Sequence, residues 1–375
     1  MDKSRLHDLI RASRTDRRAF NRHLASLGLA AVAVPLVPDV ARSAGEITYF
    51  TWAGYEIPEL HPAYIEKYGG SPEMAFFSDE EAALAKLRQG FAVDVAHPCN
   101  VVVQRWYESD VIKKLDPSRL QYWDDLIPAL RDVPGTAVDG EPIFVANDWG
   151  SHSIAYRSDI IDPAYAEEKS WELLLDETLA GRIAMEGNLN SVVAFAAMIL
   201  GIRDTTNVTD EQIEQMKEVL LRQKELLRSY FYVETNGEAM MSSGEVVASY
   251  FWSGPVYRLR DAGLPVEYMM NPKGGIISWS CGLVMTTSGQ GDEQAAYDFI
   301  NAWNSPEAGK FLIEVYGYGH SNTLTYDIVD PEILKSMGLD GDVAEYLGAS
   351  LPWQSWSPDL LMRYVRMQEE VQLAH

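Results

Sequence analysis

Segments with strand character alternate with segments of helical character along most of this chain, and this alternation constrains the fold more than any other feature. Residues 46–52, 72–78 and 93–98 are short and rich in β-branched and aromatic residues, which is typical of strands. Helical patterns separate them. Residues 170–185 are expected to form a helix followed by a strand, and a longer helix that begins with a Thr209/Gln212 capping box is expected over 209–230. Because strands alternating with helices favour parallel sheets with crossover connections, we predict an α/β fold.

The first 43 residues differ in charge from the rest of the chain. Residues 1–43 carry eight Lys or Arg and four Asp, whereas the whole chain has a net charge of −24. Arg17 and Arg18 precede Phe20, and a weakly apolar run then ends in small residues before Ala44. This arrangement is that of an export signal and resembles the twin-arginine type. We therefore expect residues 1–43 to be removed and the mature protein to be periplasmic.

The overall composition excludes several classes of function. A strongly acidic chain is not attracted to nucleic acid or to anionic lipid surfaces. We find no P-loop, GxGxxG or HExxH motif and no cysteine or histidine spacing typical of a metal site, so we predict no cofactor and no metal. The two cysteines, Cys99 and Cys281, lie far apart in the sequence, which leaves open whether they pair.

Tryptophans recur where predicted strands meet loops. In open α/β sheets a ligand binds beyond the carboxyl ends of the strands. Trp52 and Trp252 close predicted strands, Trp149 follows one, and Trp279 stands at the entrance of another. A single tryptophan at such a place is more often part of the core, but four at like positions favour an aromatic ligand site.

Six segments, taken in order, resemble the polyamine-type (spermidine/putrescine) substrate-binding proteins of bacterial ABC importers. Each motif alone is weak, but together they extend over some 280 residues in the order of the family. The segments are 49–60 (YFTWAGYEIPEL), 78–98 (SDEEAALAKLRQGFAVDVAHP), 170–185 (SWELLLDETLAGRIAM), 250–254 (YFWSG), 272–279 (PKGGIISW) and 299–322 (FINAWNSPEAGKFLIEVYGYGHSN).

The resemblance implies a two-lobed periplasmic-binding-protein fold of type II, with the ligand in the cleft between the lobes. The chain would cross between the lobes near Asp148 and near Ser280, and the lobes would close on the ligand. The implied lobes are 44–148 plus 281–325 for the first and 149–280 plus 326–375 for the second.

The resemblance also implies which residues line the site. The family places aromatic side chains around the ligand, together with polar and acidic residues. The matching positions here are Trp52, Tyr55, Cys99, Asn188, Ser191, Trp252, Trp279, Cys281, Tyr318 and Gln354, and further candidates near predicted loop mouths are Asp79, Trp149 and Glu186.

The chain departs from the family at three acidic positions, which read Asn188, Ser191 and Cys281. A buried ammonium group without a counter-charge is costly, so a di- or tri-cation fits only if other carboxylates replace the lost ones. An aromatic site suits one cationic centre, since each cation–π contact contributes about 0.5–2 kcal/mol. An ω-amino acid, a mono-cationic amine or a quaternary ammonium compound would fit. The candidate replacement carboxylates are Asp79, Glu80, Asp148 and Glu186.

We therefore expect a binding protein, and not an enzyme, that captures a small amine, works with an ABC permease in the inner membrane and is a monomer without nucleic-acid partners. Two alternatives are weighed against it. One is a thiol enzyme on the same fold, with Cys99 as nucleophile and His97 as base. The other is a ferric-ion binder that uses Tyr316 and Tyr318, although the sequence offers these tyrosines no clustered His or carboxylate partners.

Overall fold

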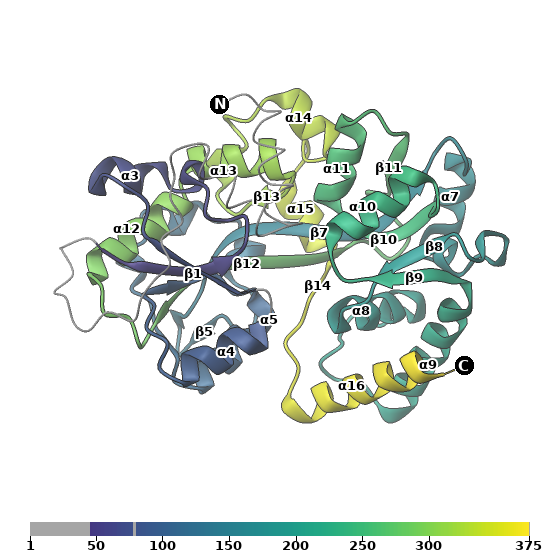
Figure 1. The fold of residues 1–375 in the computed structure, drawn as a ribbon, viewed down its shortest axis with the longest axis horizontal. Helices are drawn as coiled ribbons and strands as arrows, with labels where there is room; N and C mark the ends of the chain where they lie inside the picture. The colour runs from purple at the N-terminus through teal and green to yellow at the C-terminus, as the bar shows by residue number, and fades with distance from the viewer. Residues whose placement is uncertain (1–45, 78–79, 375) are drawn as a thin grey trace.

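A computed structural model describes residues 46–77 and 80–374 of the chain. The predicted signal segment, its cleavage before Ala44 and the candidate Asp79 lie outside these residues. The described chain forms two α/β halves that share one large sheet (Figure 1). None of the helices in these residues combines the length and the apolarity needed to cross a membrane.

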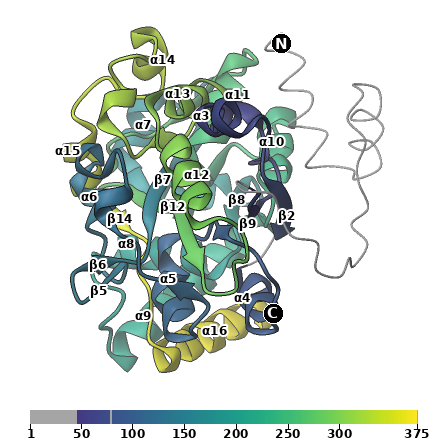
Figure 2. The same ribbon diagram turned by 90° about the vertical axis from the view of Figure 1, so that its left-hand side faces the viewer.

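The first half is built on parallel strands. Strand β1 (Thr48–Trp52) pairs in parallel with β2 (Glu73–Phe77) on one side and with β3 (Val95–Ala96) on the other. Helices cover both faces of this sheet, with α3 and α12 on one side and α4 and α5 on the other (Figures 1 and 2). The helices of this half are α3 (Pro62–Tyr68), α4 (Glu80–Arg88), α5 (Asn100–Glu108), α6 (Pro128–Arg131), α12 (Glu293–Trp303) and α13 (Pro306–Phe311).

Two long strands connect the halves. Strands β7 (Val145–Arg157) and β12 (Ile277–Thr286) are antiparallel neighbours, and every residue of β12 is buried. The pairing shifts in register between Cys281 and Gly282. The amino-terminal part of β12 also pairs with β14 (Leu351–Pro352), and its carboxyl-terminal part with β3, so this strand belongs to both halves.

The second half extends the sheet from β7. Its strand order is β7, β10 (Ala248–Trp252), β8 (Ile183–Glu186) and β9 (Leu227–Phe231), and β8 is parallel to both of its neighbours. Smaller strands β11 (Val266–Tyr268) and β13 (Gly319–His320) pair with β7. The remaining helices are α7 (Pro163–Lys169), α8 (Leu189–Leu200), α9 (Asp210–Leu226), α10 (Glu234–Ser243), α11 (Ser253–Asp261), α14 (Pro331–Ser336), α15 (Val343–Gly348) and α16 (Pro358–Leu373).

Two secondary-structure predictions are wrong in part. The helix predicted over 209–230 begins with the expected Thr209 capping box but ends at Leu226, and the next five residues form β9. Pairing of β9 with β8 satisfies the backbone of these residues, and this tertiary contact overrides the helical pattern. The helix predicted at the start of 170–185 is instead two 3₁₀ segments that precede β8.

Candidate ligand-binding site

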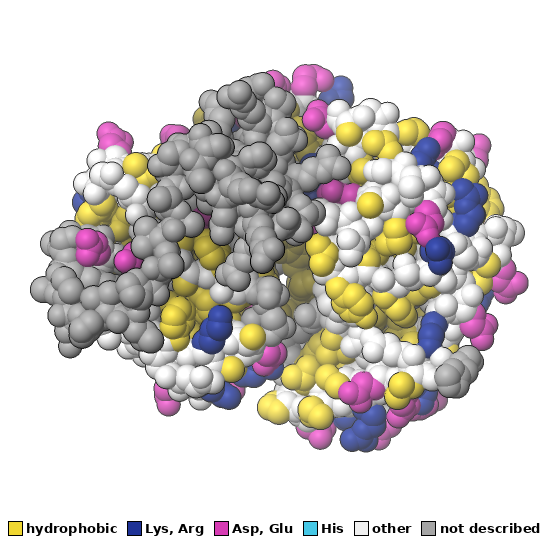
Figure 3. All heavy atoms as spheres, viewed as in Figure 1, with side chains coloured by type: hydrophobic (Ala, Val, Ile, Leu, Met, Phe, Trp, Pro, Cys, Tyr) yellow, Lys and Arg dark blue, Asp and Glu magenta, His cyan; other side chains and the backbone are white. Residues whose placement is uncertain are grey.

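The shared strands present one face to a groove between the two halves, which the space-filling view shows lined by apolar side chains (Figure 3). Alternate residues of a strand point to the same side of the sheet. Trp279 of β12 pairs with Gly150 of β7, and Cys281 pairs with Asp148, so these four residues lie on one face. A Cβ atom on Gly150 would stand 2.5 Å from the Trp279 ring, so the glycine makes room for the indole to cross β7.

The first half contributes two of the predicted aromatic residues. Trp52 ends β1 and packs edge-on against Phe77, with ring centroids 4.4 Å apart. Tyr55 is buried and donates a hydrogen bond of 2.9 Å to Asp148 Oδ2. Burial, and then the charge of Asp148, raise the pKa of Tyr55 well above its ordinary value, so the hydroxyl keeps its proton and remains a donor.

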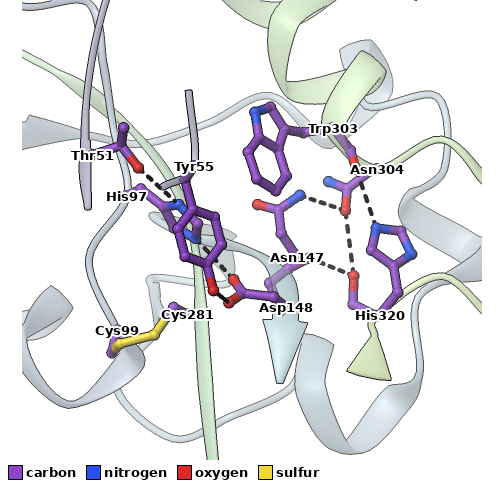
Figure 4. Close-up of polar contacts among 12 residues, drawn as sticks. Thr51, Tyr55, His97, Cys99, Asn147, Asp148, Cys281, Trp303, Asn304 and His320 are labelled. Atoms are coloured by element: carbon purple, nitrogen blue, oxygen red, sulfur yellow. Dashed lines mark hydrogen bonds and ion pairs between the residues drawn. A yellow bond between two sulfur atoms is a disulfide. The ribbon is translucent and has the colours of Figure 1, made fainter. Parts of the chain in front are cut away.

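Asp148 is held by a buried network (Figure 4). His97 Nε2 lies 2.8 Å from Asp148 Oδ1, and His97 Nδ1 lies 2.8 Å from the Tyr49 hydroxyl and 3.3 Å from the Thr51 hydroxyl. Because Tyr55 bonds the other carboxylate oxygen, both oxygens of Asp148 are engaged by protein groups. This candidate replacement carboxylate therefore serves the junction of the halves.

Cys99 and Cys281 form a disulfide beside this network (Figure 4). Cys99 is the N-cap residue of α5, and its N–H donates a hydrogen bond of 2.6 Å to Glu80. The disulfide ties the start of this helix to β12. A nucleophilic cysteine requires a thiolate, so Cys99 in this state cannot serve the thiol-enzyme alternative.

The second half gathers two of the predicted polar positions around one carboxylate. Glu186, the last residue of β8, is buried. Asn188 caps α8 by accepting a 2.8 Å bond from Ser191 N–H. The Asn188 amide and the Ser191 hydroxyl donate to the two oxygens of Glu186. Both side chains thus bind the carboxylate of Glu186, which lies two residues before Asn188 in the sequence.

His152 of β7 completes this group. Its Nε2 lies 3.0 Å from Glu186 Oε2, an ion-pair distance, although neither ring nitrogen makes an aligned hydrogen bond in the part of the chain that the structure describes. Three aromatic rings surround the imidazole: Tyr250 and Trp353 stack on it with centroids at 4.9 and 5.2 Å, and Trp252 lies at 5.3 Å.

Trp279 meets Tyr318 edge-to-face, with ring centroids 5.0 Å apart. The Tyr318 hydroxyl donates to Glu234, which also forms an ion pair of 2.8 Å with Arg258. Tyr316, the other tyrosine of the ferric-ion alternative, donates to the carbonyl oxygen of Gly54. The described residues contain no group of three or more His, Cys, Asp or Glu that could hold a metal.

Two predicted residues lie apart from the others. Trp149 points to the opposite face of β7 from Trp279, and its indole N–H contacts the His320 carbonyl oxygen at 3.2 Å. The Gln354 side chain accepts bonds of 2.7 and 2.8 Å from Thr205 N–H and Oγ1. Both residues stay predictions as ligand-binding positions, and the site that we propose does not use them.

Three residues of this arrangement, His152, Tyr250 and Glu234, are not among the predicted site residues. His152 stands two residues after Gly150 on the same strand, so strand periodicity could have found it. Trp353 lies in an aromatic segment near the C-terminus whose position no local pattern predicts. Its place follows from the pairing of β14 with β12, a contact between distant parts of the sequence.

Comparisons with known proteins agree with this architecture. The family model described as "Bacterial extracellular solute-binding protein" matches residues 73–336. The Spermidine/putrescine-binding periplasmic protein of Salmonella typhimurium is 25% identical over 329 residues, covering 87% of this chain and 91% of that protein. Its Escherichia coli counterpart is 24% identical over the same shares of both chains.

A solved structure is also similar. The Spermidine/Putrescine ABC Transporter Substrate-Binding Protein from Streptococcus pneumoniae superposes with a TM-score of 0.76 at 18% identity, covering 88% of this chain and 99% of that one. These findings confirm the predicted α/β fold of the two-lobed periplasmic-binding-protein type and the resemblance to the polyamine-type proteins. They do not test the predicted lobe boundaries or the individual site residues, which stay predictions.

Proposed function

Because the chain belongs to the family of bacterial extracellular solute-binding proteins, we propose that it is the periplasmic substrate-binding component of an ABC importer and that it captures a small amine. The names of its relatives, which bind spermidine and putrescine, support the amine. The observation that carries the proposal is that aromatic side chains of both halves contact β7, one of the strands that join them. Tyr55 of the first half bonds Asp148, Trp252 of the second half lies beside His152, and Trp52 ends β1 near Tyr55 in the sequence.

The proposed ligand carries a single cationic centre. Of the three acidic positions of the family, Cys281 is part of a disulfide, while Asn188 and Ser191 donate to Glu186. The carboxylates that lie nearby, Asp148 and Glu186, are already engaged by protein groups. A second ammonium group would therefore lose its hydration without gaining a counter-charge. Aromatic faces such as those of Trp279 and Tyr318 suit one amine.

Indole N–H groups on the walls favour a ligand that also accepts hydrogen bonds. The Nε1 atoms of Trp52, Trp279 and Trp353 are buried without a partner among the described residues. Each buried donor left without a partner costs about 1–3 kcal/mol, which an acceptor on the ligand would recover. Trp106 and Trp303 share the feature within the core, so the position of the other three on the walls is what matters. An ω-amino acid offers both an amine and an acceptor.

The proposal includes an export pathway and a permease partner. Residues 1–43 would direct export through the twin-arginine pathway, and the mature chain would act as a monomer that delivers its ligand to an inner-membrane permease. The halves, proposed as 44–148 plus 281–325 and 149–280 plus 326–375, would close about β7 and β12. We propose no enzymatic activity, because the disulfide occupies Cys99.

Tryptophan fluorescence of the mature protein tests the proposal. Spermidine, putrescine, 4-aminobutyrate and betaine would be titrated separately, since closure on a ligand changes the surroundings of the wall tryptophans. We expect a saturable change with 4-aminobutyrate or betaine. Trp279→Phe, which removes an indole from the groove face of β12 and keeps a ring, should weaken binding. Micromolar spermidine binding without binding of the mono-cationic compounds would refute the single-cation site.

A further inference from the structure

The surroundings of His152 are those that an amine ligand would need. The rings of Tyr250 and Trp353 stack on its imidazole, and the ring of Trp252 lies at a similar distance in a tilted orientation. A cation over aromatic faces is attracted by their quadrupoles, most strongly where water is excluded. His152 has no exposed surface, so this aromatic cage is closed around it.

A carboxylate, that of Glu186, lies beside the imidazole of His152. Glu186 Oε2 is 3.0 Å from His152 Nε2, and the other groups that bond Glu186, the amide of Asn188 and the hydroxyl of Ser191, are neutral. Glu186 is only 4% exposed. A buried carboxylate needs a counter-charge, and His152 is the cationic side chain within ion-pair distance of it among residues 46–77 and 80–374.

The remaining groups that face the ring add no charge. Tyr250 comes from β10, and burial, followed by the charge of Glu186, raises the pKa of its hydroxyl well above the ordinary value. Trp252 from β10 and Trp353 from the segment after β14 do not titrate. The cage therefore holds one negative charge, from Glu186, and one group able to balance it.

The cage belongs to the same wall as the predicted ligand residues. Asn188 and Ser191 hold its carboxylate, and Trp252 is one of its sides. His152 also stands on the same face of β7 as Gly150, over which Trp279 lies. An aromatic cage with a carboxylate at this place is thus an amine subsite by its chemistry.

We propose that His152 is a built-in cation that occupies an amine subsite of the second half. The imidazolium neutralises Glu186 and fills the cage, so this end of the groove rejects a ligand ammonium group. The inference deepens the proposed function, because it explains which protein group takes the place of a second ligand charge. Removal of the imidazole should uncover a site for small cations, whatever the natural ligand of the protein is.

Removal of the side chain in His152→Ala tests this directly. We expect methylammonium chloride at 100 mM to raise the Tm of this variant by at least about 2 °C more than an equal concentration of NaCl, because a ligand that binds only the folded state stabilises it. Methanol, the neutral analogue of similar size, should not produce this increase. Any methylammonium effect on the wild-type protein, which keeps its own proposed amine site, should be smaller than the effect on His152→Ala.

Two matched controls define the cation site. His152→Ala/Glu186→Gln keeps the aromatic cage but lacks the charge, so the methylammonium effect should disappear. His320→Ala opens a cavity at another fully buried histidine, which bonds the Trp303 carbonyl oxygen and Thr325 and no carboxylate, so no such effect is expected there. Equal stabilisation of His152→Ala by methylammonium and methanol, or an effect that survives Glu186→Gln, would overturn the proposal.

A measurement on the wild-type protein covers the case in which the variants fail to fold. The side-chain ¹⁵N NMR signals of His152 at pH 7 should be those of an imidazolium, with both nitrogens protonated. Signals of a neutral ring would overturn the proposal. Neither experiment uses an amine substrate, so cation binding by His152→Ala without binding of any tested amine by the wild type would refute the proposed function alone.

Discussion

Two buried carboxylate–histidine pairs occur in the part of the chain that the structure describes, and their surroundings differ. Asp148 and His97 lie where the halves join, and both the carboxylate and the imidazole are tied to neighbouring hydroxyls, with Tyr55 bonded to the one and Tyr49 to the other. Glu186 and His152 lie in the second half, where the carboxylate has two polar donors. The imidazole lies 3.0 Å from Glu186 and near three aromatic rings, and neither of its nitrogens makes an aligned hydrogen bond among the described residues.

From this difference we infer that the Asp148 pair supports the structure, whereas the Glu186 pair belongs to ligand recognition. A polar network in which each member is satisfied fixes one arrangement of the strands, which suits a junction. An imidazole held by aromatic faces in place of hydrogen bonds resembles a bound ligand more than a structural element. The same two residue types therefore perform different tasks, and their neighbours decide which.

The largest effect is expected from the disulfide beside the Asp148 pair. Cys99 and Cys281 are separated by 182 residues in the sequence. Closing so long a loop restricts the unfolded chain, so Cys99→Ser/Cys281→Ser should lower the free energy of unfolding by about 4–5 kcal/mol. Urea unfolding with and without a reductant measures this loss. An unchanged midpoint would show that the disulfide does not stabilise the junction.

A smaller effect should distinguish the two carboxylates. Tyr55→Phe removes the hydroxyl that donates to Asp148 Oδ2, and loss of a bond to a buried charged group costs about 1.5–3 kcal/mol. Ser191→Ala should cost less than about 1 kcal/mol, because His152 stays beside the same oxygen of Glu186. Both values come from urea unfolding at pH 7. The reverse order would contradict the division into supporting and recognising pairs.

A third buried histidine sharpens the comparison through pH. Burial without a carboxylate partner lowers the pKa of His320 to about 4, from an ordinary value near 6.5. Below pH 6.5 the unfolded chain takes up a proton at this residue that the folded chain does not, so stability is complete above pH 6.5 and decreases as the pH falls toward 4.

The expected slope is at most about 1.4 kcal/mol per pH unit for one proton. His320→Gln should remove this part of the slope between pH 6 and pH 4.5, as measured by urea unfolding of both proteins at each pH. Subtracting the two curves cancels the carboxylates that titrate in the same range. Parallel curves of unfolding free energy against pH for the two proteins would contradict the lowered pKa of His320.

Much of the fold could be predicted from the sequence because its signals are local. Strand β1, the Thr209 capping box and β12 follow from residue types within a few positions. The end of α9 at Leu226 could not, since it depends on the pairing of β9 with a strand some 40 residues away.

The candidate site divides in the same way. Its aromatic residues stand at strand ends and are visible in the sequence, as Trp52 and Trp252 show. The neutral positions Asn188 and Ser191 were predicted to mean a missing charge, whereas they hold Glu186 in place. That contact, and the cage around His152, arise only when the strands and the C-terminal segment meet.

The most direct measurement compares two ligands of similar length that differ in one charged end. Isothermal titration calorimetry of the mature protein with 4-aminobutyrate and with putrescine reports the affinity for one and for two ammonium groups. Since the second-half carboxylate already has His152 as its partner at 3.0 Å, we expect 4-aminobutyrate to bind at least about tenfold more tightly than putrescine, a difference of about 1.4 kcal/mol or more. Tighter binding of putrescine would contradict the single-cation site.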